Sequence, residues 1–288
     1  MLKSTCRLPR LSLHLELVKR MELKSMHAFI IDLDGTLYKG NEPIDGADRF
    51  IAKLYEEGYP FQLVTNNSSR TPEAVAIHLK KFNIEVETAN IFTSAQATVQ
   101  YLQEENIGRR VYMIGEEGLR VALTEAGYEI VDEAPDAVVQ GIDRSFSYEK
   151  LATATIHIQA GTRFVLTNPD HLLPADGRLW PGAGTIAASI EKATGQQPVV
   201  IGKPSPIIMR YAMTRLGAAA ERTWVIGDNC ITDIAGGAAV SCRTALVLTG
   251  VATVSNWREH AEHASVQPDL VCANLDEVYA QVTNSPLK

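Results

Sequence analysis

The chain has 288 residues, of which 45 % are hydrophobic and 21 % are charged, a composition typical of a globular protein with one large or two medium domains. The formal net charge of −7 argues against a general nucleic-acid binder, and no apolar stretch is long enough to predict a membrane span. The four cysteines show no CxxC spacing, which predicts free thiols and a cytoplasmic location. They are Cys6, Cys230, Cys242 and Cys272.

The first 25 residues carry several basic side chains and recurring leucines, without the clean apolar core and small-residue cleavage site of a signal peptide. We therefore expect residues 1–25 to be an N-terminal extension that takes no part in the chemistry. The folded part of the chain is expected to begin near residue 26.

The apolar residues 28–31 predict a buried strand, and Asp32, Asp34 and Gly35 follow it directly. In open α/β sheets ligands bind at the carboxyl ends of the strands, where both aspartates would lie. Two carboxylates so close repel each other, and Mg²⁺ relieves this because it prefers oxygen ligands and is commonly held by one or two carboxylates and a phosphate. The alternative is a strand followed by an ordinary Asp-Gly turn.

Apolar strand-like runs alternate with amphipathic helical stretches along the rest of the chain. Strands are expected over residues 61–64, 198–201, 224–226 and 245–248, and helices over residues 47–57, 72–82, 205–216 and 233–240. This alternation predicts an α/β fold with a Rossmann-like parallel sheet core and helices on both faces.

Polar groups of the kind that carry chemistry come directly after four of the predicted strands. They are Asp32, then Thr65 with Asn66 and Asn67, then Lys203, and then Asp228. Each group alone is compatible with a turn or a helix cap. Four such groups, each at the end of a strand, indicate a site at the carboxyl edge of the sheet.

The distance between Thr65 and Lys203 indicates an insertion, because far more residues separate them than one βα unit needs. We expect a core domain over residues 26–107 and 198–288 and an inserted, smaller α/β cap domain over residues 108–197. Within the insertion, strands are expected over residues 111–114, 137–140 and 164–167, and helices over residues 119–126 and 148–159.

These motifs together resemble the haloacid dehalogenase-like hydrolase superfamily. The motif Asp-Leu-Asp-Gly-Thr begins at Asp32, Thr65 matches the second motif, Lys203 the third, and Asp228 with Asp233 the fourth. The stretches 64–68, 202–204 and 246–251 resemble the NagD-like branch. Residues 114–118 and 141–144 resemble most closely its acid sugar phosphatase (YutF-like) group of bacteria.

The resemblance implies a Mg²⁺-dependent phosphatase in which Asp32 attacks phosphorus and forms an aspartyl-phosphate. Asp34 would protonate the leaving group and then activate the water that hydrolyses the intermediate. Thr65 and Lys203 would hold the phosphoryl oxygens. Asn66 and Asn67 are expected beside them as substrate-binding residues.

The same resemblance implies a metal site and a cap domain that covers it. Mg²⁺ would be held by Asp32, the main-chain carbonyl of Asp34 and Asp228, with Asp233 supporting its water shell. The insertion matches a C2-type cap in its location. Its substrate contacts are expected at Asn168, Asp170 and His171, with further candidates at Arg144, Arg178 and Trp180.

The expected partner is a small phosphorylated metabolite, with sugar or acid-sugar phosphates first, and no nucleic acid or membrane. A homodimer through the cap is a further expectation. The alternatives are a nucleoside monophosphate phosphatase of the 5'-nucleotidase type, a phosphomutase, or a non-catalytic binding module on the same fold. A binding module should have lost at least one of Asp32, Asp34, Lys203 and Asp228, whereas all four are present.

Overall fold

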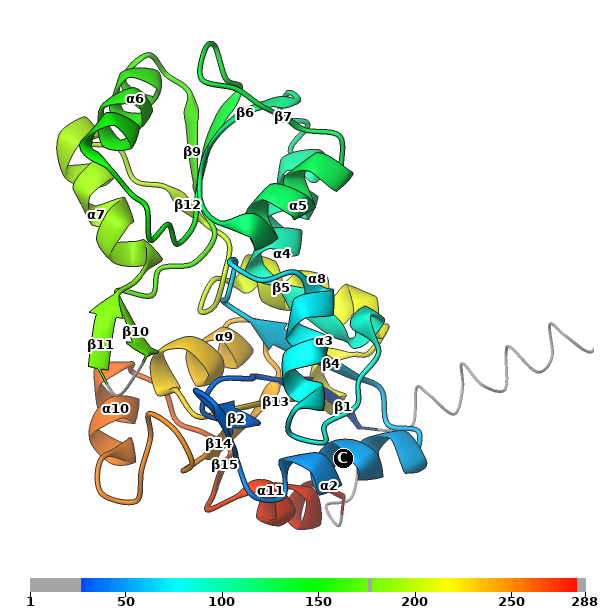
Figure 1. The fold of residues 1–288 in the computed structure, drawn as a ribbon. Helices are drawn as coiled ribbons and strands as arrows, with labels where there is room; N and C mark the ends of the chain where they lie inside the picture. The colour runs from blue at the N-terminus through cyan, green and yellow to red at the C-terminus, as the bar shows by residue number, and fades with distance from the viewer. Residues whose placement is uncertain (1–26, 176–177, 284–288) are drawn as a thin grey trace, which may run out of the picture.

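A computed structural model describes residues 27–175 and 178–283 and contains two parallel sheets, one above the other in Figure 1. The expected N-terminal extension, Cys6 included, lies outside the described residues. In the described part of the chain the other three cysteines are buried and free, as expected. No described helix is long and apolar enough to cross a bilayer, and the cytoplasmic location stays a prediction.

The first sheet has six strands in the order β15-β14-β13-β1-β4-β5, and every neighbouring pair is parallel. The strands are β1 (Ala28–Ile31), β4 (Phe61–Thr65), β5 (Ile91–Thr93), β13 (Thr223–Gly227), β14 (Arg243–Val247) and β15 (Leu270–Cys272). The chain runs outward from β1 through β4 and β5, and later outward on the other side through β13, β14 and β15. The strand order therefore reverses between β1 and β13, where α/β folds place their ligand crevice.

Helices cover both faces of this sheet because neighbouring strand residues point to opposite sides. Phe29 and Ile31 belong to one buried cluster and Ile30 to another. The first cluster includes α2 (Ala47–Glu56), α3 (Pro72–Lys80) and α11 (Leu275–Thr283). The second includes α4 (Ser94–Glu104) and α8 (Pro206–Leu216). The predicted α/β class is confirmed.

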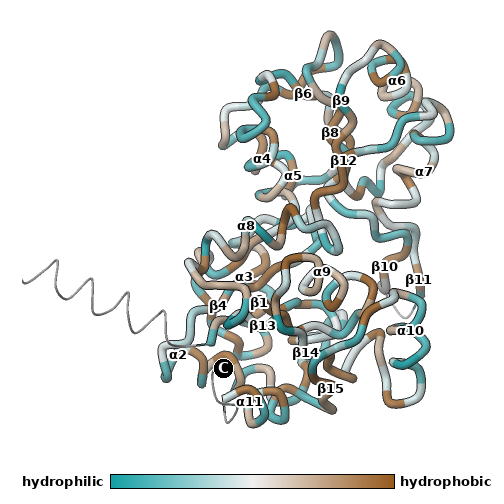
Figure 2. Tube along the Cα trace, turned by 180° about the vertical axis from the view of Figure 1, so that it is seen from behind, coloured by the Kyte–Doolittle hydropathy of each residue, from teal (hydrophilic) through white to brown (hydrophobic). Residues whose placement is uncertain are grey.

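The second sheet has the order β12-β9-β8-β6-β7 and is also parallel throughout. Its strands are β6 (Arg110–Ile114), β7 (Glu129–Ile130), β8 (Ala137–Gln140), β9 (Arg163–Leu166) and β12 (Val199–Val200). Helices α6 (Tyr148–Gln159) and α7 (Ala183–Thr194) pack together over one face, and α5 (Glu117–Glu125) contacts α4 on the other. Hydrophobic stretches run through the strands of both sheets (Figure 2).

Several helix starts are specified by the residue just before them, whose side chain accepts a hydrogen bond from a main-chain N–H of the first turn. Thr71 caps α3 and Thr93 caps α4, where Gln96 returns a second bond in a capping box. Ser147 and Ser205 cap α6 and α8 in the same way. These local signals explain why the helices predicted at 72–82, 148–159 and 205–216 begin within a residue of the expected positions.

The structure changes two of the predicted elements and adds others. The strand expected at 198–201 is β12, which pairs with β9 of the second sheet and not with the first. The helix expected at 233–240 is instead a π-helical turn η3 (Cys230–Ile234) followed by the short α9 (Ala235–Ala238). Two small antiparallel hairpins were not predicted, β2 (Tyr38–Lys39) with β3 (Glu42–Pro43), and β10 (Leu172–Ala175) with β11 (Arg178–Pro181).

The remaining elements connect these layers. They are the 3₁₀ turns η1 (Thr88–Asn90) and η2 (Ala220–Arg222) and the helix α10 (Trp257–His263). The chain passes between the two sheets twice, from α4 to β6 and from β12 to α8 (Figure 1). The division into a core at 26–107 and 198–288 and a cap at 108–197 stays an interpretation, and β12 lies just beyond the expected cap boundary.

Candidate active site

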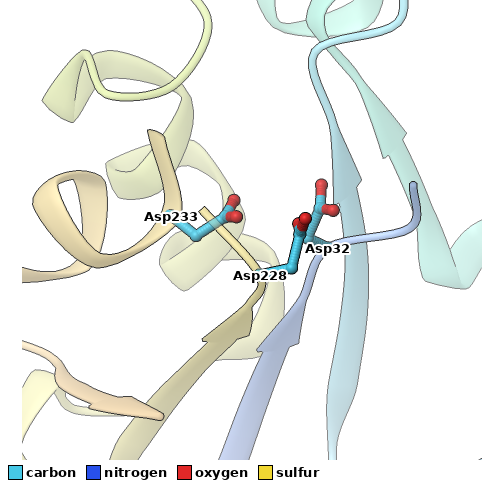
Figure 3. A group of neighbouring side chains, drawn as sticks. All are labelled: Asp32, Asp228 and Asp233. Carbon is cyan, nitrogen blue, oxygen red and sulfur yellow. The ribbon is translucent and has the colours of Figure 1, made fainter. Parts of the chain in front are cut away.

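Three carboxylates meet at the point where the strand order of the first sheet reverses (Figure 3). Asp32 follows β1, Asp228 follows β13, and Asp233 lies in η3. One oxygen of each lies within 4.8 Å of the others. Asp228 and Asp233 are buried and Asp32 is partly buried, so the group is set into the edge of the sheet.

Lys203 joins two of these carboxylates. Its Nζ donates to Asp32 Oδ1 at 2.5 Å and to Asp233 Oδ1 at 2.7 Å. A third hydrogen bond of 3.0 Å goes to the carbonyl of Val64. The side chain is only 3 % exposed. Burial alone would lower the pKa of Lys203, but the charges of Asp233 and Asp32 outweigh burial and raise it, so the ammonium stays charged.

The cluster carries more negative than positive charge. Burial raises the pKa of Asp228 to about 7, with the charge of Asp233 adding to the effect. Burial also raises the pKa of Asp32 well above its ordinary value, although Lys203 opposes this. One ammonium therefore does not compensate three converging carboxylates. Three convergent carboxylates with uncompensated charge fit a divalent cation, and oxygen donors suit a hard one.

Two glycines make room for the Asp228 carboxylate. A Cβ atom on Gly35 would lie 2.2 Å from Asp228 Oδ2, and one on Gly250 would lie 2.0 Å from the same oxygen. Gly35 also has a φ of +89°, which a residue with a Cβ rarely adopts. The main-chain N–H of Val251 donates to Asp228 Oδ2 at 2.5 Å.

Asp34 lies beside the cluster rather than in it. Its Oδ2 accepts a hydrogen bond of 3.1 Å from the hydroxyl of Tyr38. The residue reaches solvent. Surrounding protein atoms nevertheless bury the carboxylate enough to raise its pKa, against the smaller lowering by Tyr38 and Arg70. Such a group can hold a proton and also exchange it with a bound molecule.

Three residues at the end of β4 and in the loop after it, Thr65, Asn66 and Asn67, make different contacts from one another. Thr65 Oγ1 accepts from the N–H of Asn67 at 3.0 Å, which leaves the hydroxyl proton free to donate. The Asn66 side chain binds both main-chain groups of Lys203. The Asn67 side chain accepts from the N–H and the hydroxyl of Ser69, at 2.8 Å each, and so stabilises the turn. The Asn66 amide is thus engaged by the protein through both its atoms, and the Asn67 amide through its oxygen.

The loop after β9 brings the second sheet to this site. Asn168 Nδ2 donates to the carbonyl of Asn66 at 2.8 Å. Both carboxylate oxygens of Asp170 lie near Asn66 Nδ2, at 3.1 and 3.2 Å. Burial raises the pKa of Asp170 to about 6, while the bond from Asn66 and the charge of Lys203 lower it. Asn168 and Asp170 therefore lie beside the lysine.

The remaining candidates from the second part of the chain do not meet the carboxylates. His171 is exposed. Arg144 forms an ion pair of 2.6 Å with Glu116. Arg178 and Trp180 are exposed on β11. No hydrogen bond of these four side chains to the carboxylate cluster occurs within the described residues.

Sequence reasoning missed three groups that touch the site: the Tyr38 hydroxyl, the Val64 carbonyl and the Val251 N–H. Tyr38 follows the first aspartate motif at short range, so an aromatic hydroxyl there was a usable signal. The two main-chain groups carry no signal in residue type, because any residue at those positions has them.

Comparison with known proteins decides the family. Residues 29–129 match the family described as haloacid dehalogenase-like hydrolase, and residues 200–278 match the HAD-hydrolase-like family. The chain is 42 % identical over 255 residues to the 5'-nucleotidase YutF of Bacillus subtilis, covering 88 % of this chain and 98 % of that protein. The chain belongs to the haloacid dehalogenase-like hydrolase family.

Two further similarities locate it within that family. The acid sugar phosphatase of Staphylococcus aureus is 42 % identical over 261 residues, covering 90 % of this chain and 99 % of that protein. The structure of NagD from E. coli K-12 superposes with a TM-score of 0.81 at 32 % identity, covering 88 % of this chain and 98 % of that one. The expected NagD-like membership is confirmed, and so is the expected enzyme class, a phosphoric monoester hydrolase of this family.

Proposed function

We propose that this haloacid dehalogenase-like hydrolase is a Mg²⁺-dependent phosphatase of small phosphomonoesters that works through an aspartyl-phosphate on Asp32. The observation that carries the proposal is the contact of 2.5 Å between Asp32 Oδ1 and Lys203 Nζ, inside a cluster of three carboxylates at the reversal point of the sheet. A buried carboxylate held by a cation and open on its other side is suited to attack an electrophile.

The proposed reaction has two steps. Asp32 forms a bond to phosphorus while the bond from phosphorus to the leaving oxygen breaks, and Asp34 gives that oxygen a proton. Asp34, now a carboxylate, then takes a proton from the water that attacks the aspartyl-phosphate, which returns Asp32 and releases inorganic phosphate. The raised pKa of Asp34 supports a role that requires both protonation states.

The phosphoryl oxygens would be held by Lys203, by the free hydroxyl proton of Thr65 and by the main-chain N–H of Asn66. The metal would be held by Asp32, Asp228 and the main-chain carbonyl of Asp34. It supplies neutralisation of the phosphate charge, which otherwise repels an anionic nucleophile. Both oxygens of Asp233 already accept hydrogen bonds, from Lys203 and from the N–H of Asn229, which supports a role in the water shell of the metal.

Sugar or acid-sugar phosphates are the first substrate class, and nucleoside monophosphates the second. One similar protein is named an acid sugar phosphatase and another a 5'-nucleotidase. Asn168 and Asp170 are the proposed contacts with the leaving group, because their loop adjoins Lys203. His171 is proposed as a weaker contact at the exposed side of this loop. A homodimer through the cap remains a proposal.

The test is release of inorganic phosphate from a panel of sugar phosphates, sugar-acid phosphates, nucleoside monophosphates and phosphoglycolate, with Mg²⁺ and with EDTA. Asp32→Asn should abolish release. During turnover of the wild type, an acid-stable phosphoryl group should be detected on Asp32. Product isomers without free phosphate would favour a phosphomutase. Tight binding without turnover would favour a binding module.

A further inference from the structure

Tyr38 is tied to the segment that carries Asp34 by side chain and by main chain. Its hydroxyl donates to Asp34 Oδ2 at 3.1 Å. Its carbonyl accepts from the N–H of Gly35 at 2.7 Å, and a β-bridge joins Asp34 to Tyr38. The turn between the two residues is thus closed from both sides, and any movement of Tyr38 is transmitted to the Asp34 carboxylate.

The ring of Tyr38 is held in place by aromatic neighbours from α3 and the turn after it. The ring of His78 meets it edge to face, with centroids 4.8 Å apart, and the ring of Phe82 lies 5.7 Å away. Tyr38 is 4 % exposed. A ring confined on two sides directs its hydroxyl to one place.

This hydrogen bond engages one of the two carboxylate oxygens of Asp34. The Tyr38 hydroxyl is its donor, and Oδ2 is the acceptor. A protonated carboxyl group keeps acceptor capacity beside its O–H, so Oδ2 can accept from Tyr38 in either protonation state of Asp34. Oδ1 is therefore the oxygen left to exchange a proton with a bound molecule. Within the described part of the chain no hydrogen bond is made to Oδ1.

We propose that Tyr38 is a positioning residue that holds Asp34 with Oδ1, the oxygen that Tyr38 does not engage, toward the leaving group. The inference rests on the proposed function, in which Asp34 is the acid. As the bond from phosphorus to the leaving oxygen breaks, its electron pair stays on that oxygen and the Oδ1 proton of Asp34 moves to it. Tyr38 keeps its own proton throughout.

The inference makes the effect of Tyr38→Phe depend on the leaving group. A p-nitrophenolate departs without protonation, whereas an alkoxide requires an acid. The constant kcat/KM covers only the steps through leaving-group release, so the later hydrolysis of the aspartyl-phosphate does not enter it. We expect Tyr38→Phe to lower kcat/KM roughly tenfold for a sugar phosphate, which is a part of the rate enhancement that acid catalysis supplies. For p-nitrophenyl phosphate we expect a loss of less than about twofold.

The comparison uses three variants with both substrates, in the presence of Mg²⁺. Tyr55→Phe is the matched control, because its hydroxyl also donates to a side chain, that of Asn90, but on the surface. Tyr55→Phe should leave kcat/KM unchanged for both substrates. Asp34→Asn reports on the acid itself and should show the same substrate dependence as Tyr38→Phe, more strongly.

The outcomes separate the two ideas. A substrate-dependent loss in both Asp34→Asn and Tyr38→Phe supports the inference. Dependence in Asp34→Asn, with a uniform loss or no loss in Tyr38→Phe, overturns the role of Tyr38 and leaves the proposed function intact. No dependence in Asp34→Asn overturns the acid role and the inference with it. If Tyr38→Phe fails to fold, Phe82→Leu loosens the same ring and carries the same comparison.

Discussion

The side-chain amide of Asn66 binds both main-chain groups of Lys203: Oδ1 accepts from the N–H at 2.8 Å and Nδ2 donates to the carbonyl at 2.9 Å. Nδ2 also contacts the carboxylate of Asp170. The amide therefore fixes the main chain of the lysine against the loop after β4. It also connects that loop to Asp170, in the loop that follows β9 of the second sheet.

Asn66→Ala should lower both stability and turnover. It leaves two buried main-chain groups of Lys203 without partners, which costs about 1–3 kcal/mol in free energy of unfolding. The ammonium should then shift relative to Asp32, so kcat should fall more than KM rises. Urea unfolding and steady-state kinetics measure the two effects. Asn67→Ala removes only bonds to Ser69 and is the control. Equal effects of both variants on kcat would contradict the holding role.

Asp228→Asn should remove the stabilisation by Mg²⁺ without lowering the stability of the metal-free protein. Removing one of three neighbouring carboxylates relieves repulsion, so the metal-free variant should melt at or above the temperature of the metal-free wild type. A ligand at 100 times its Kd stabilises a protein by about 2.7 kcal/mol, and the wild type should gain stability of this order with Mg²⁺. Melting curves with EDTA and with increasing Mg²⁺ test this. Equal stabilisation of wild type and variant would place the metal elsewhere.

Gly118→Ala should disturb the loop that carries Asn66 and Asn67. A Cβ at residue 118 would lie 2.6 Å from main-chain atoms of Arg70, and the N–H of Gly118 donates to the carbonyl of Ser69 at 3.0 Å. Overpacking against a backbone costs roughly 1–3 kcal/mol. We expect a lower melting temperature and a higher KM for the phosphate ester. Glu117→Ala, at an exposed neighbour, should change neither.

Stability at low pH should depend on Asp143. Its side chain is 2 % exposed, and it accepts bonds from Lys150 at 2.6 Å and from the N–H and hydroxyl of Ser145. Burial would raise the pKa of Asp143, but the bonds from Lys150 and Ser145 outweigh burial and lower it. A lowered pKa means that this stabilisation is complete above the unfolded value of about 4 and is lost as the pH falls through the folded value.

The comparison of wild type with Asp143→Asn isolates this effect. At pH 7 the variant should be less stable by about 1–3 kcal/mol, because the hydrogen bonds to a charged group are weakened. The difference should shrink below about pH 4, where the carboxylate of the unfolded wild type becomes protonated before that of the folded protein. Urea unfolding at several pH values measures it. A difference that stays constant down to pH 3 would show that the pKa of Asp143 is not lowered.

The parts of the fold and site that sequence predicted depend on local signals. The apolar run at 28–31 and the residues after it define a strand and its end, and the same is true of Thr65 after β4 and Asp228 after β13. The helices predicted at 148–159 and 205–216 begin at serine caps. Three site residues could therefore be placed at one edge of a parallel sheet before the structure was known.

The parts that sequence missed depend on contacts between distant segments. Val199–Val200 is a short apolar run that suits either sheet, and its pairing with β9 is decided by the surrounding packing. The side chains of Asn66 and Asn67 have the residue type of phosphate-loop ligands, but they bond to protein groups that only the folded chain brings near. The contact of Tyr38 with Asp34 requires a turn whose closure residue type alone does not reveal.

The position of Lys203 sets a limit on exchanging parts between such enzymes. The lysine lies three residues after the end of β12, an edge strand of the second sheet, yet its ammonium lies between two aspartates that follow strands of the first. A chimera that replaced residues 108–197 with the cap domain of another enzyme would separate β12 from β9. The segment that carries the lysine would then lose its pairing with the second sheet. A functional graft would have to carry the segment through Pro204 as part of the transplanted piece, and with it the partner of Asn66.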